Sequence, residues 1–283
     1  MLTQESTTGS PAEHFSRPQN PFALWIHDFR RYREIIFFRT YASLKAETEK
    51  AYLGYVWWFL EPVVNTILFY TIFAIFLKHQ SPNYVVFLVI GFVFWEWFQS
   101  TVSFSMPSIG SKANLLQLIY LPKFIFPMCS ILSNAWKFVC VLAVLLVYLW
   151  ISGFPPSVAY LALPLVLAIQ LALIIAVSFP TAIIFPIFPD SQIFIQTLLR
   201  GLMLVSGIFF EGSKLAPGPA KTWFYVNPIA HLIDMYRSIL IDHEFPALWS
   251  LAYTATFSLI FLVFSFWLMR KVDRIMPKLL TRE

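Results

Sequence analysis

Six long apolar runs decide what this chain can fold into. Crossing the hydrocarbon core of a bilayer takes about 20 apolar residues in a helix, and each run reaches that length, the fifth only just. Charged residues make up 12% of the 283 residues, about half the share of a soluble domain, so polar surface is too scarce for a water-exposed globule. The runs are residues 52–77, 84–106, 124–151, 158–187, 193–210 and 247–269. We therefore predict an all-α polytopic membrane protein with six transmembrane helices.

Basic residues are unevenly divided between the two sides that six spans would create. Fourteen Lys and Arg fall in the N-terminal segment, the loops after the second and fourth runs, and the C-terminal tail, whereas four fall on the opposite side. The remaining two, Lys137 and Arg200, lie within runs. By the positive-inside rule the richer side faces the cytoplasm. The sequence thus predicts that both termini are cytoplasmic.

The segments outside the runs have distinct patterns. Residues 1–19 are polar and rich in Pro, Ser and Thr, which predicts a disordered cytoplasmic tail, and residues 273–283 form a second tail. Asn20-Pro21 is a helix start. Apolar residues then recur at three-, four- and seven-residue steps, so residues 21–38 are expected to form an amphipathic helix in the membrane interface.

Two connections between runs are not simple loops. The cytoplasmic one contains a short helical pattern over residues 108–121, which ends where Leu121 precedes a proline. The external segment 211–246 is apolar enough in places to dip into the membrane, where backbone must be covered by protein or line a cavity. We expect one or two short re-entrant or surface helices there.

Motifs for catalysis or metal binding are weak in this sequence. The nearest match to a nucleotide-binding loop, residues 207–214, ends in Ser-Lys rather than Lys-Ser and follows a predicted span rather than a strand. Cys129 and Cys140 fit neither a disulfide framework nor a metal site and indicate two small apolar helix residues. Five polar residues are either ordinary groups at a helix end or an enzyme site at the membrane surface: His231, Asp234, Asp242, His243 and Glu244.

Polar groups inside the runs need an explanation, because they are costly within a membrane. Each is either half of a structural ion pair, an interfacial group or part of a cavity. The four candidates are Glu61, Glu96, Lys137 and Arg200. Their spacing does not form a proton or ion relay.

Four motifs together resemble the permeases of ABC-2-type polysaccharide exporters, the membrane subunits that export O-antigen, capsule or teichoic acid. Residues 53–62 (LGYVWWFLEP) look like the family's first span. Residues 114–127 (NLLQLIYLPKFIFP) are similar to its cytoplasmic stretch before the third span, and residues 227–237 (NPIAHLIDMYR) to its Asn-Pro…Arg segment. Phe188-Pro189-Asp190 stands where the family usually has Phe-Arg-Asp. The resemblance covers residues 20–272.

This resemblance implies a half-transporter of the bacterial inner membrane and no enzyme activity of its own. Two copies would form the channel for a lipid-linked polysaccharide, driven by two copies of a separate ABC ATPase that binds ATP and Mg. The chain itself would hold no cofactor and bind no nucleic acid. The helix 108–121 would couple the permease to the ATPase through Asn114, Leu115, Leu118 and Tyr120. Segment 211–246 would cap the external mouth.

The same resemblance gives the aromatic residues a role, because sugar rings stack on aromatic faces. Aromatics make up 18% of the chain, and lipid-facing rings would account for the count equally well. The predicted channel lining is Trp57, Trp58, Phe69, Tyr70, Phe94, Trp95, Trp97, Phe98, Phe209 and Phe210. Membrane topology alone, or contact with the pyrophosphate of the lipid carrier, would account for Arg33, Arg39 and Lys45.

The sequence departs from the family pattern at Pro189 and at residues 47 and 48, and two alternative functions stay open. Seven and six positions before Gly54 the family commonly has a basic residue and an aromatic, where this chain has Glu47 and Thr48.

The first alternative function is an ABC-2 permease for a small molecule or lipid, and the second is a membrane-embedded transferase. Segment 227–237 favours a transporter over the transferase, and segment 53–62 favours the polysaccharide branch.

Overall fold

The computed structural model describes residues 21–50, 54, 56–72, 83–112, 122–212 and 218–273. All regular structure in these residues is helical, which confirms the predicted all-α class. The α-helices are α1 (Pro21–Lys50), α2 (Val56–Tyr70), α3 (Tyr84–Ser105), α5 (Ile125–Ile151), α6 (Leu163–Ile187), α7 (Ser191–Val205), α8 (Pro219–Val226), α9 (Pro228–Leu240) and α10 (Leu248–Asp273). The short 3-10 helices are η2 (Met106–Ser108), η3 (Gly110–Lys112) and η4 (Val158–Ala162).

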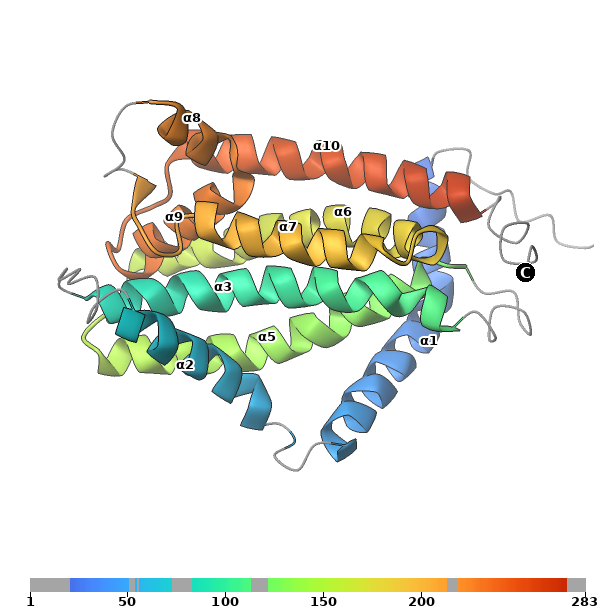
Figure 1. Ribbon diagram of the computed structural model, residues 1–283, viewed down its shortest axis with the longest axis horizontal. Coiled ribbons are helices and arrows are strands. Elements are labelled where there is room, and N and C mark those ends of the chain that lie inside the picture. The colour runs from blue at the N-terminus through green and yellow to red at the C-terminus, as the bar shows by residue number, and fades with distance from the viewer. Residues whose placement is uncertain are drawn as a thin grey trace, which may run out of the picture.

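Helix α3 is the centre of the bundle (Figure 1). It packs against α2, α5, α6 and α9, whereas α10 packs mainly on α6. Of the most apolar stretch of α3, 72% is buried inside the chain, against 17% for α10. Four described segments are long and apolar enough to cross a membrane: Tyr84–Ser108, Ile125–Ile151, Val158–Ile187 and Leu248–Lys271. These helices support a multi-pass membrane protein.

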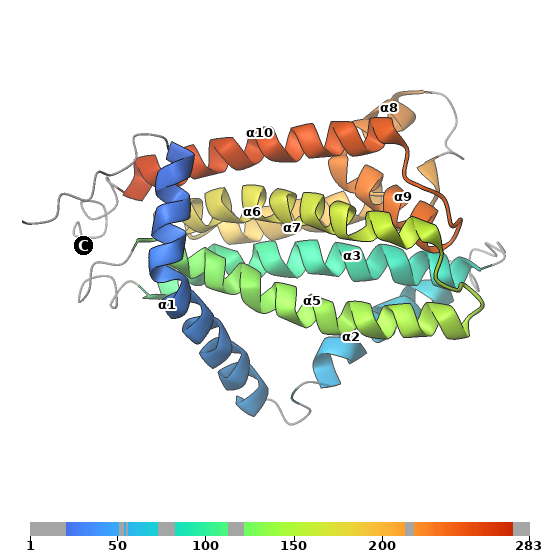
Figure 2. The ribbon, with the colours of Figure 1, turned by 180° about the vertical axis from the view of Figure 1, so that it is seen from behind.

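The two ends of the bundle differ. Helices α8 and α9 lie at one end, while α1 and the C-terminal end of α10 lie at the other (Figures 1 and 2). Helix α1 is steeply inclined to the bundle, as a helix lying in a membrane interface would be. It begins at Pro21 as predicted but ends at Lys50 rather than at residue 38. The reason is that residues 39–50 contain no Pro or Gly and are rich in helix-forming Ala, Lys and Glu.

Two of the predicted spans are represented by shorter helices. Helices α2 and α7 have 15 residues each, or about 22 Å of rise, less than the roughly 30 Å of a hydrocarbon core. The part of the first run after residue 72 lies outside the described residues. Helix α7 ends at Val205 rather than residue 210 because Gly207 takes a left-handed φ of 74°. A Cβ atom there would lie 2.7 Å from the Phe224 ring.

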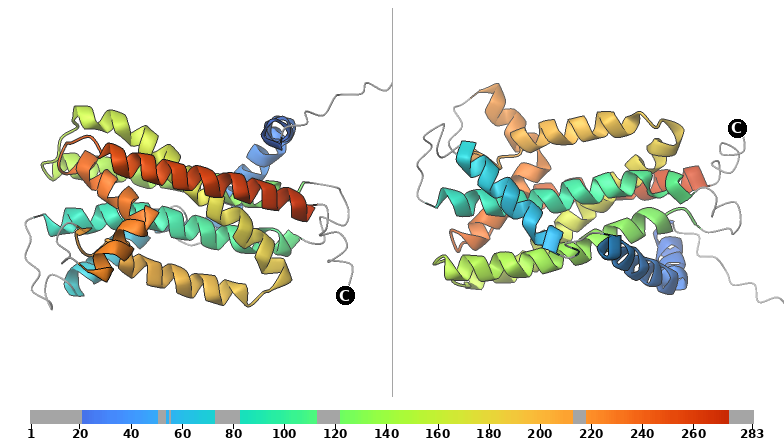
Figure 3. Two further views of the ribbon diagram at one scale, coloured as in Figure 1. Left: turned by 90° about the horizontal axis from the view of Figure 1, so that it is seen from above. Right: turned by 60° about the horizontal axis from the view of Figure 1, so that its bottom comes forward.

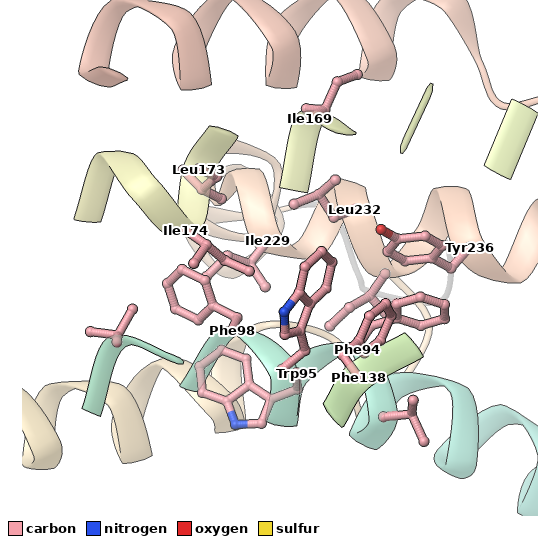
Figure 4. Close-up of a cluster of buried hydrophobic side chains, with 14 of the residues drawn as sticks. Phe94, Trp95, Phe98, Phe138, Ile169, Leu173, Ile174, Ile229, Leu232 and Tyr236 are labelled. Atoms are coloured by element: carbon pink, nitrogen blue, oxygen red, sulfur yellow. The ribbon is translucent and has the colours of Figure 1, made fainter. Parts of the chain in front are cut away.

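The core around α3 is built largely from aromatic rings. Phe94 stacks on Tyr236 of α9 with ring centroids 3.4 Å apart, and Trp97 stacks on Phe138 of α5 at 4.0 Å. Figure 4 shows Phe94 and Trp95 among apolar side chains of α6 and α9. Such ring pairs contribute about 0.5–1.5 kcal/mol each beyond their burial. A part of the aromatic surplus therefore holds α3, α5 and α9 together.

Candidate functional site

Three adjoining cavities form one groove along α3 and α5. Helix α2 crosses these helices obliquely (Figure 3), and the C-terminal part of α1 lies beside them. We call the cavities the serine cavity, the lysine cavity and the valine slot, with volumes of about 200, 300 and 320 Å³. Neighbouring cavities share lining residues. Their α5 lining recurs at three- and four-residue steps, which places it on one helix face: Ser130, Ser133, Lys137, Val141, Val144 and Tyr148.

The lysine cavity has a charged pair at its centre. Lys137 Nζ lies 2.5 and 2.6 Å from the two carboxylate oxygens of Glu47 in α1. The same ammonium lies 5.5 Å from the centroid of the Trp58 ring and 5.1 Å from that of Phe104. The side chain of Lys137 is 12% exposed and that of Glu47 is 44% exposed. A nearly buried cation is thus balanced by a half-exposed carboxylate, beside open space.

The serine cavity continues the groove toward the end where α1 crosses the bundle. Arg39 and Ser43 of α1 line it together with Glu47 and Lys137. Two of its lining residues, Arg39 and Ser133, carry a buried polar atom without a hydrogen-bond partner, Arg39 Nη1 and Ser133 Oγ. Ser133 is only 7% exposed. Buried polar groups are nearly always bonded, so these two atoms indicate a place for a polar ligand or ordered water.

The valine slot continues the groove in the opposite direction and is almost entirely apolar. Its wall is formed by branched and aromatic side chains of α2, α3 and α5. These are Phe59, Val63, Ile67, Val85, Val89, Val93, Val141, Val144, Leu145 and Tyr148. The groove therefore changes along its length from hydroxyl-rich, through charged and aromatic, to apolar.

A second buried cation, Arg237 of α9, faces α3 at the other end of the bundle. It is 5% exposed and donates to three backbone carbonyls: Gly207 O at 2.7 Å, Ile208 O at 3.0 Å and Phe87 O at 3.2 Å. Its guanidinium carbon lies 3.3 Å from the centroid of the Phe87 ring. Arg237 thus fixes the turn after α7 against the first turns of α3, which is the second reason that α7 ends early.

The sequence around Arg237 explains how α9 is placed. Asn227 caps the helix by accepting from the backbone N–H of Ile229 at 3.0 Å, and it donates to Ser206 Oγ at 2.9 Å. Burial lowers the pKa of Arg237 from its ordinary value to about 9, opposed by the carboxylate of Asp234. Burial also raises the pKa of Asp234 above its ordinary value of 3.8, opposed by Arg237. At neutral pH the guanidinium is therefore protonated and held in place.

The aromatic residues predicted to line a channel fall in several places. Three line the lysine cavity: Trp57, Trp58 and Trp97. Three others are at most 3% exposed within this chain: Phe94, Trp95 and Phe98. Two follow α7 outside any helix: Phe209 and Phe210. The side chains of Phe69 and Tyr70 lie outside the described residues. Channel lining by this set stays a prediction.

The predicted polar residues are also dispersed. Glu96 lines the lysine cavity, whereas Arg200 is exposed on α7. Arg33 is exposed on α1 and Lys45 lies 3.8 Å from Glu49 on its surface. Five further predicted site residues lie outside what the structure describes, Glu61 by its side chain and the others entirely: Glu61, Asn114, Leu115, Leu118 and Tyr120.

The residues of the possible enzyme site have other partners or lie apart. His231 is 4% exposed, with ring nitrogens 2.9 Å from Tyr225 O and 3.2 Å from Ser250 Oγ. Asp234 lies 3.8 Å from Arg237. Within the described ranges, no cluster of three His, Cys, Asp or Glu side chains could hold a metal ion. These contacts give His231 and Asp234 structural roles at the end of the bundle.

Sequence reasoning missed Glu47 and Ser133 as site residues. Glu47 was apparent only as an acid where similar sequences have a base, and Lys137 only as a lone cation within a run. They are 90 positions apart, so no spacing rule could join them. Ser133 carried no signal, because a serine in an apolar run usually bonds its own helix.

The fold and the groove together define a multi-pass α-helical membrane protein with a cavity of mixed polarity between its helices. Residues 40–241 match the ABC-2 type transporter family. This match covers more than half of the chain, and the chain belongs to that family. ABC-2 transporter chains are transport proteins, so the membrane-bound transferase considered from the sequence is not supported.

Named relatives align over most of the chain at modest identity. The O-antigen export system permease protein RfbA of Myxococcus xanthus is 25% identical over 222 residues, which is 78% of this chain and 85% of that protein. A protein of the same name from Klebsiella pneumoniae is 26% identical over 204 residues, 72% of this chain and 78% of the other. The polysialic acid transport protein KpsM of Escherichia coli is 25% identical over 236 residues, 80% of this chain and 88% of KpsM.

Proposed function

We propose that this chain is the transmembrane subunit of an ABC transporter that exports a lipid-linked cell-surface polysaccharide. The observation that carries the proposal is that relatives named for two different polysaccharides, O-antigen and polysialic acid, align over 72–80% of the chain. The groove supports it, since Trp57 and Trp58 beside Glu47 and Lys137 offer stacking faces and hydrogen-bonding groups suited to sugars.

The proposed topology is six spans in the bacterial inner membrane with both termini in the cytoplasm. The division of basic residues supports this orientation, and so does the position of α1 and the end of α10 at the same end of the bundle. Helices α2 and α7 would be the first and fifth spans. Helices α8 and α9 would cap the external end.

The proposed assembly is a homodimer of this chain with two copies of an ABC ATPase. ATP and Mg would bind to the ATPase, and residues 108–121 would transmit its closure. Replacing Leu115 or Leu118 with Asp, at the predicted contact, is expected to weaken co-purification of the ATPase while the permease still inserts in the membrane. Full complex formation and full transport by both variants would refute the coupling assignment.

Deletion of the gene in its host tests the proposed function. We expect loss of the surface polysaccharide, accumulation of its lipid-linked form on the cytoplasmic face of the inner membrane, and reversal of both effects by the wild-type gene. Antibody labelling of intact cells and gels of cell extracts measure the surface polysaccharide. Lipid extraction of the membranes measures the lipid-linked form. A deletion strain with full surface polysaccharide and raised sensitivity to a small toxic compound would favour the small-molecule exporter instead.

A further inference from the structure

We infer that the groove between α2, α3 and α5 binds the anchored end of the exported molecule, a long-chain hydrocarbon phosphate. Its phosphate would bond to Lys137 and to the unpartnered polar atoms of the serine cavity, and its chain would occupy the valine slot. This inference rests on the proposed function, because it identifies where the lipid carrier of that substrate is held.

The polar part of the groove is built for an anion with several oxygens. Lys137 offers an ammonium at the thirteenth position of the 27-residue helix α5, near the middle of the span. Arg39 and Ser133 line the cavity next to it, and each carries a buried polar atom without a hydrogen-bond partner, Arg39 Nη1 and Ser133 Oγ. A phosphate has enough acceptor oxygens to bond all three groups, and charge-assisted bonds of this kind are the strong ones. A charged group at this depth generally marks a functional site.

The order of polarity along the groove matches one orientation of such a lipid. The serine cavity lies toward the end of the bundle that α1 crosses, which is cytoplasmic in the proposed topology. From Lys137 to Tyr148 the α5 wall rises about 16 Å, close to half of the roughly 30 Å hydrocarbon core. A lipid that has moved from the inner leaflet toward the outer half of the bilayer would therefore have its headgroup at the serine cavity and its chain in the valine slot.

Glu47 makes the site exchangeable. Its carboxylate occupies the position that a phosphate oxygen would take on Lys137, at 2.5 and 2.6 Å. Its side chain is 44% exposed to the outside of this chain, so it can turn away from Lys137 when a phosphate arrives, and the phosphate then balances the ammonium. Removing the carboxylate and removing the ammonium should then change phosphate binding in opposite directions.

Photo-crosslinking of the full-length protein in phosphatidylcholine nanodiscs tests the site. The probes are a diazirine-bearing isoprenyl phosphate, the isoprenyl alcohol of the same length, and a diazirine-bearing phosphatidylglycerol. We expect the phosphate probe to label peptides of α3 and α5 that line the valine slot about tenfold more than the alcohol does. Equal labelling by all three probes, the alcohol included, would overturn the inference, since it would indicate a general lipid surface that does not recognise the phosphate.

Four variants locate the binding groups, each with a matched control. Lys137→Gln is expected to lower phosphate-probe labelling about tenfold and Glu47→Gln to raise it several-fold, whereas Lys271→Gln on α10 leaves it unchanged. Val144→Trp should block the slot, and Val139→Trp, on another face of α5 with a similar exposure of 55% against 53%, should not. Unchanged labelling in Lys137→Gln, or equal labelling in the two tryptophan variants, would overturn the assignment.

Two separate failures can be told apart by these experiments. If the gene is needed for surface polysaccharide but the phosphate probe does not label the slot, the groove assignment is wrong and the proposed function stands. If the probe labels the slot as expected but the gene is dispensable for polysaccharide, the lipid-phosphate site is supported and the cargo is a different one.

Discussion

Two buried cations face α3 from neighbouring helices, and they are held in opposite ways. Arg237 bonds to three backbone carbonyls, two in the turn after α7 and one in the first turn of α3. Lys137 is held by one side-chain carboxylate, from a half-exposed residue, beside a cavity of about 300 Å³. Fixed backbone acceptors make a cation part of the scaffold, whereas a replaceable counter-ion leaves it available to a ligand. The difference separates a structural arginine from a proposed binding lysine.

Removing Arg237 should have the largest effect on folding stability. Arg237→Leu leaves the carbonyls of Gly207, Ile208 and Phe87 without their donor, and we expect it to lower the free energy of unfolding by about 3–5 kcal/mol. Thermal unfolding followed by tryptophan fluorescence in detergent measures this. Arg200→Leu, the same change at an exposed position of α7, is the control. Equal unfolding temperatures for Arg237→Leu and wild type would contradict the structural role.

Adding a methyl group next to Arg237 should have an intermediate effect on stability. A Cβ atom on Gly91 of α3 would lie 2.9 Å from Arg237 Nη2 and 3.3 Å from the backbone of Ile208. Gly91→Ala is therefore expected to cost about 1–3 kcal/mol of stability by overpacking. In Gly201→Ala the new methyl group meets no atom within 4 Å, so that variant should be neutral or slightly stabilised. A stable Gly91→Ala would show that Arg237 can shift away from α3.

Breaking the ion pair between Glu47 and Lys137 should have little effect on folding. A double-mutant cycle with Glu47→Gln and Lys137→Gln is expected to give a coupling free energy of about 1 kcal/mol, because the pair is partly solvated. Denaturant unfolding of the two single variants, the double variant and wild type measures it. A coupling of about 3 kcal/mol or more would class Lys137 with Arg237, as part of the scaffold.

The smallest expected effect concerns pH. Because burial raises the pKa of Asp234 above 3.8, its contribution to stability is full below that value and is lost as the pH rises through the folded-state pKa. Asp234→Asn should therefore gain stability relative to wild type as the pH rises from about 4 to 7, measured as the difference in melting temperature. A difference that shrinks with rising pH would mean that attraction to Arg237 outweighs burial.

Part of the fold and of the groove can be predicted from the sequence. Apolar length predicts the long helices α3, α5, α6 and α10, and Asn227-Pro228 predicts the start of α9, because these signals are local. The end of α7 depends on bonds from Arg237, 30 residues away, so hydropathy extends it too far. The pairing of Glu47 with Lys137 depends on how α1 crosses the bundle. The sequence marks Lys137 as unusual but does not identify its partner.

In the proposed function Lys137 serves transport, whereas Arg237 serves the fold. The most direct measurement is surface polysaccharide per folded permease molecule, in the deletion strain complemented with wild type, Lys137→Gln or Lys271→Gln. We predict that Lys137→Gln reaches a folded level close to wild type but exports about tenfold less polysaccharide per molecule, the effect of losing about 1.4 kcal/mol of binding, while Lys271→Gln exports normally. Normal export per molecule by Lys137→Gln would show that Lys137 is not needed for transport.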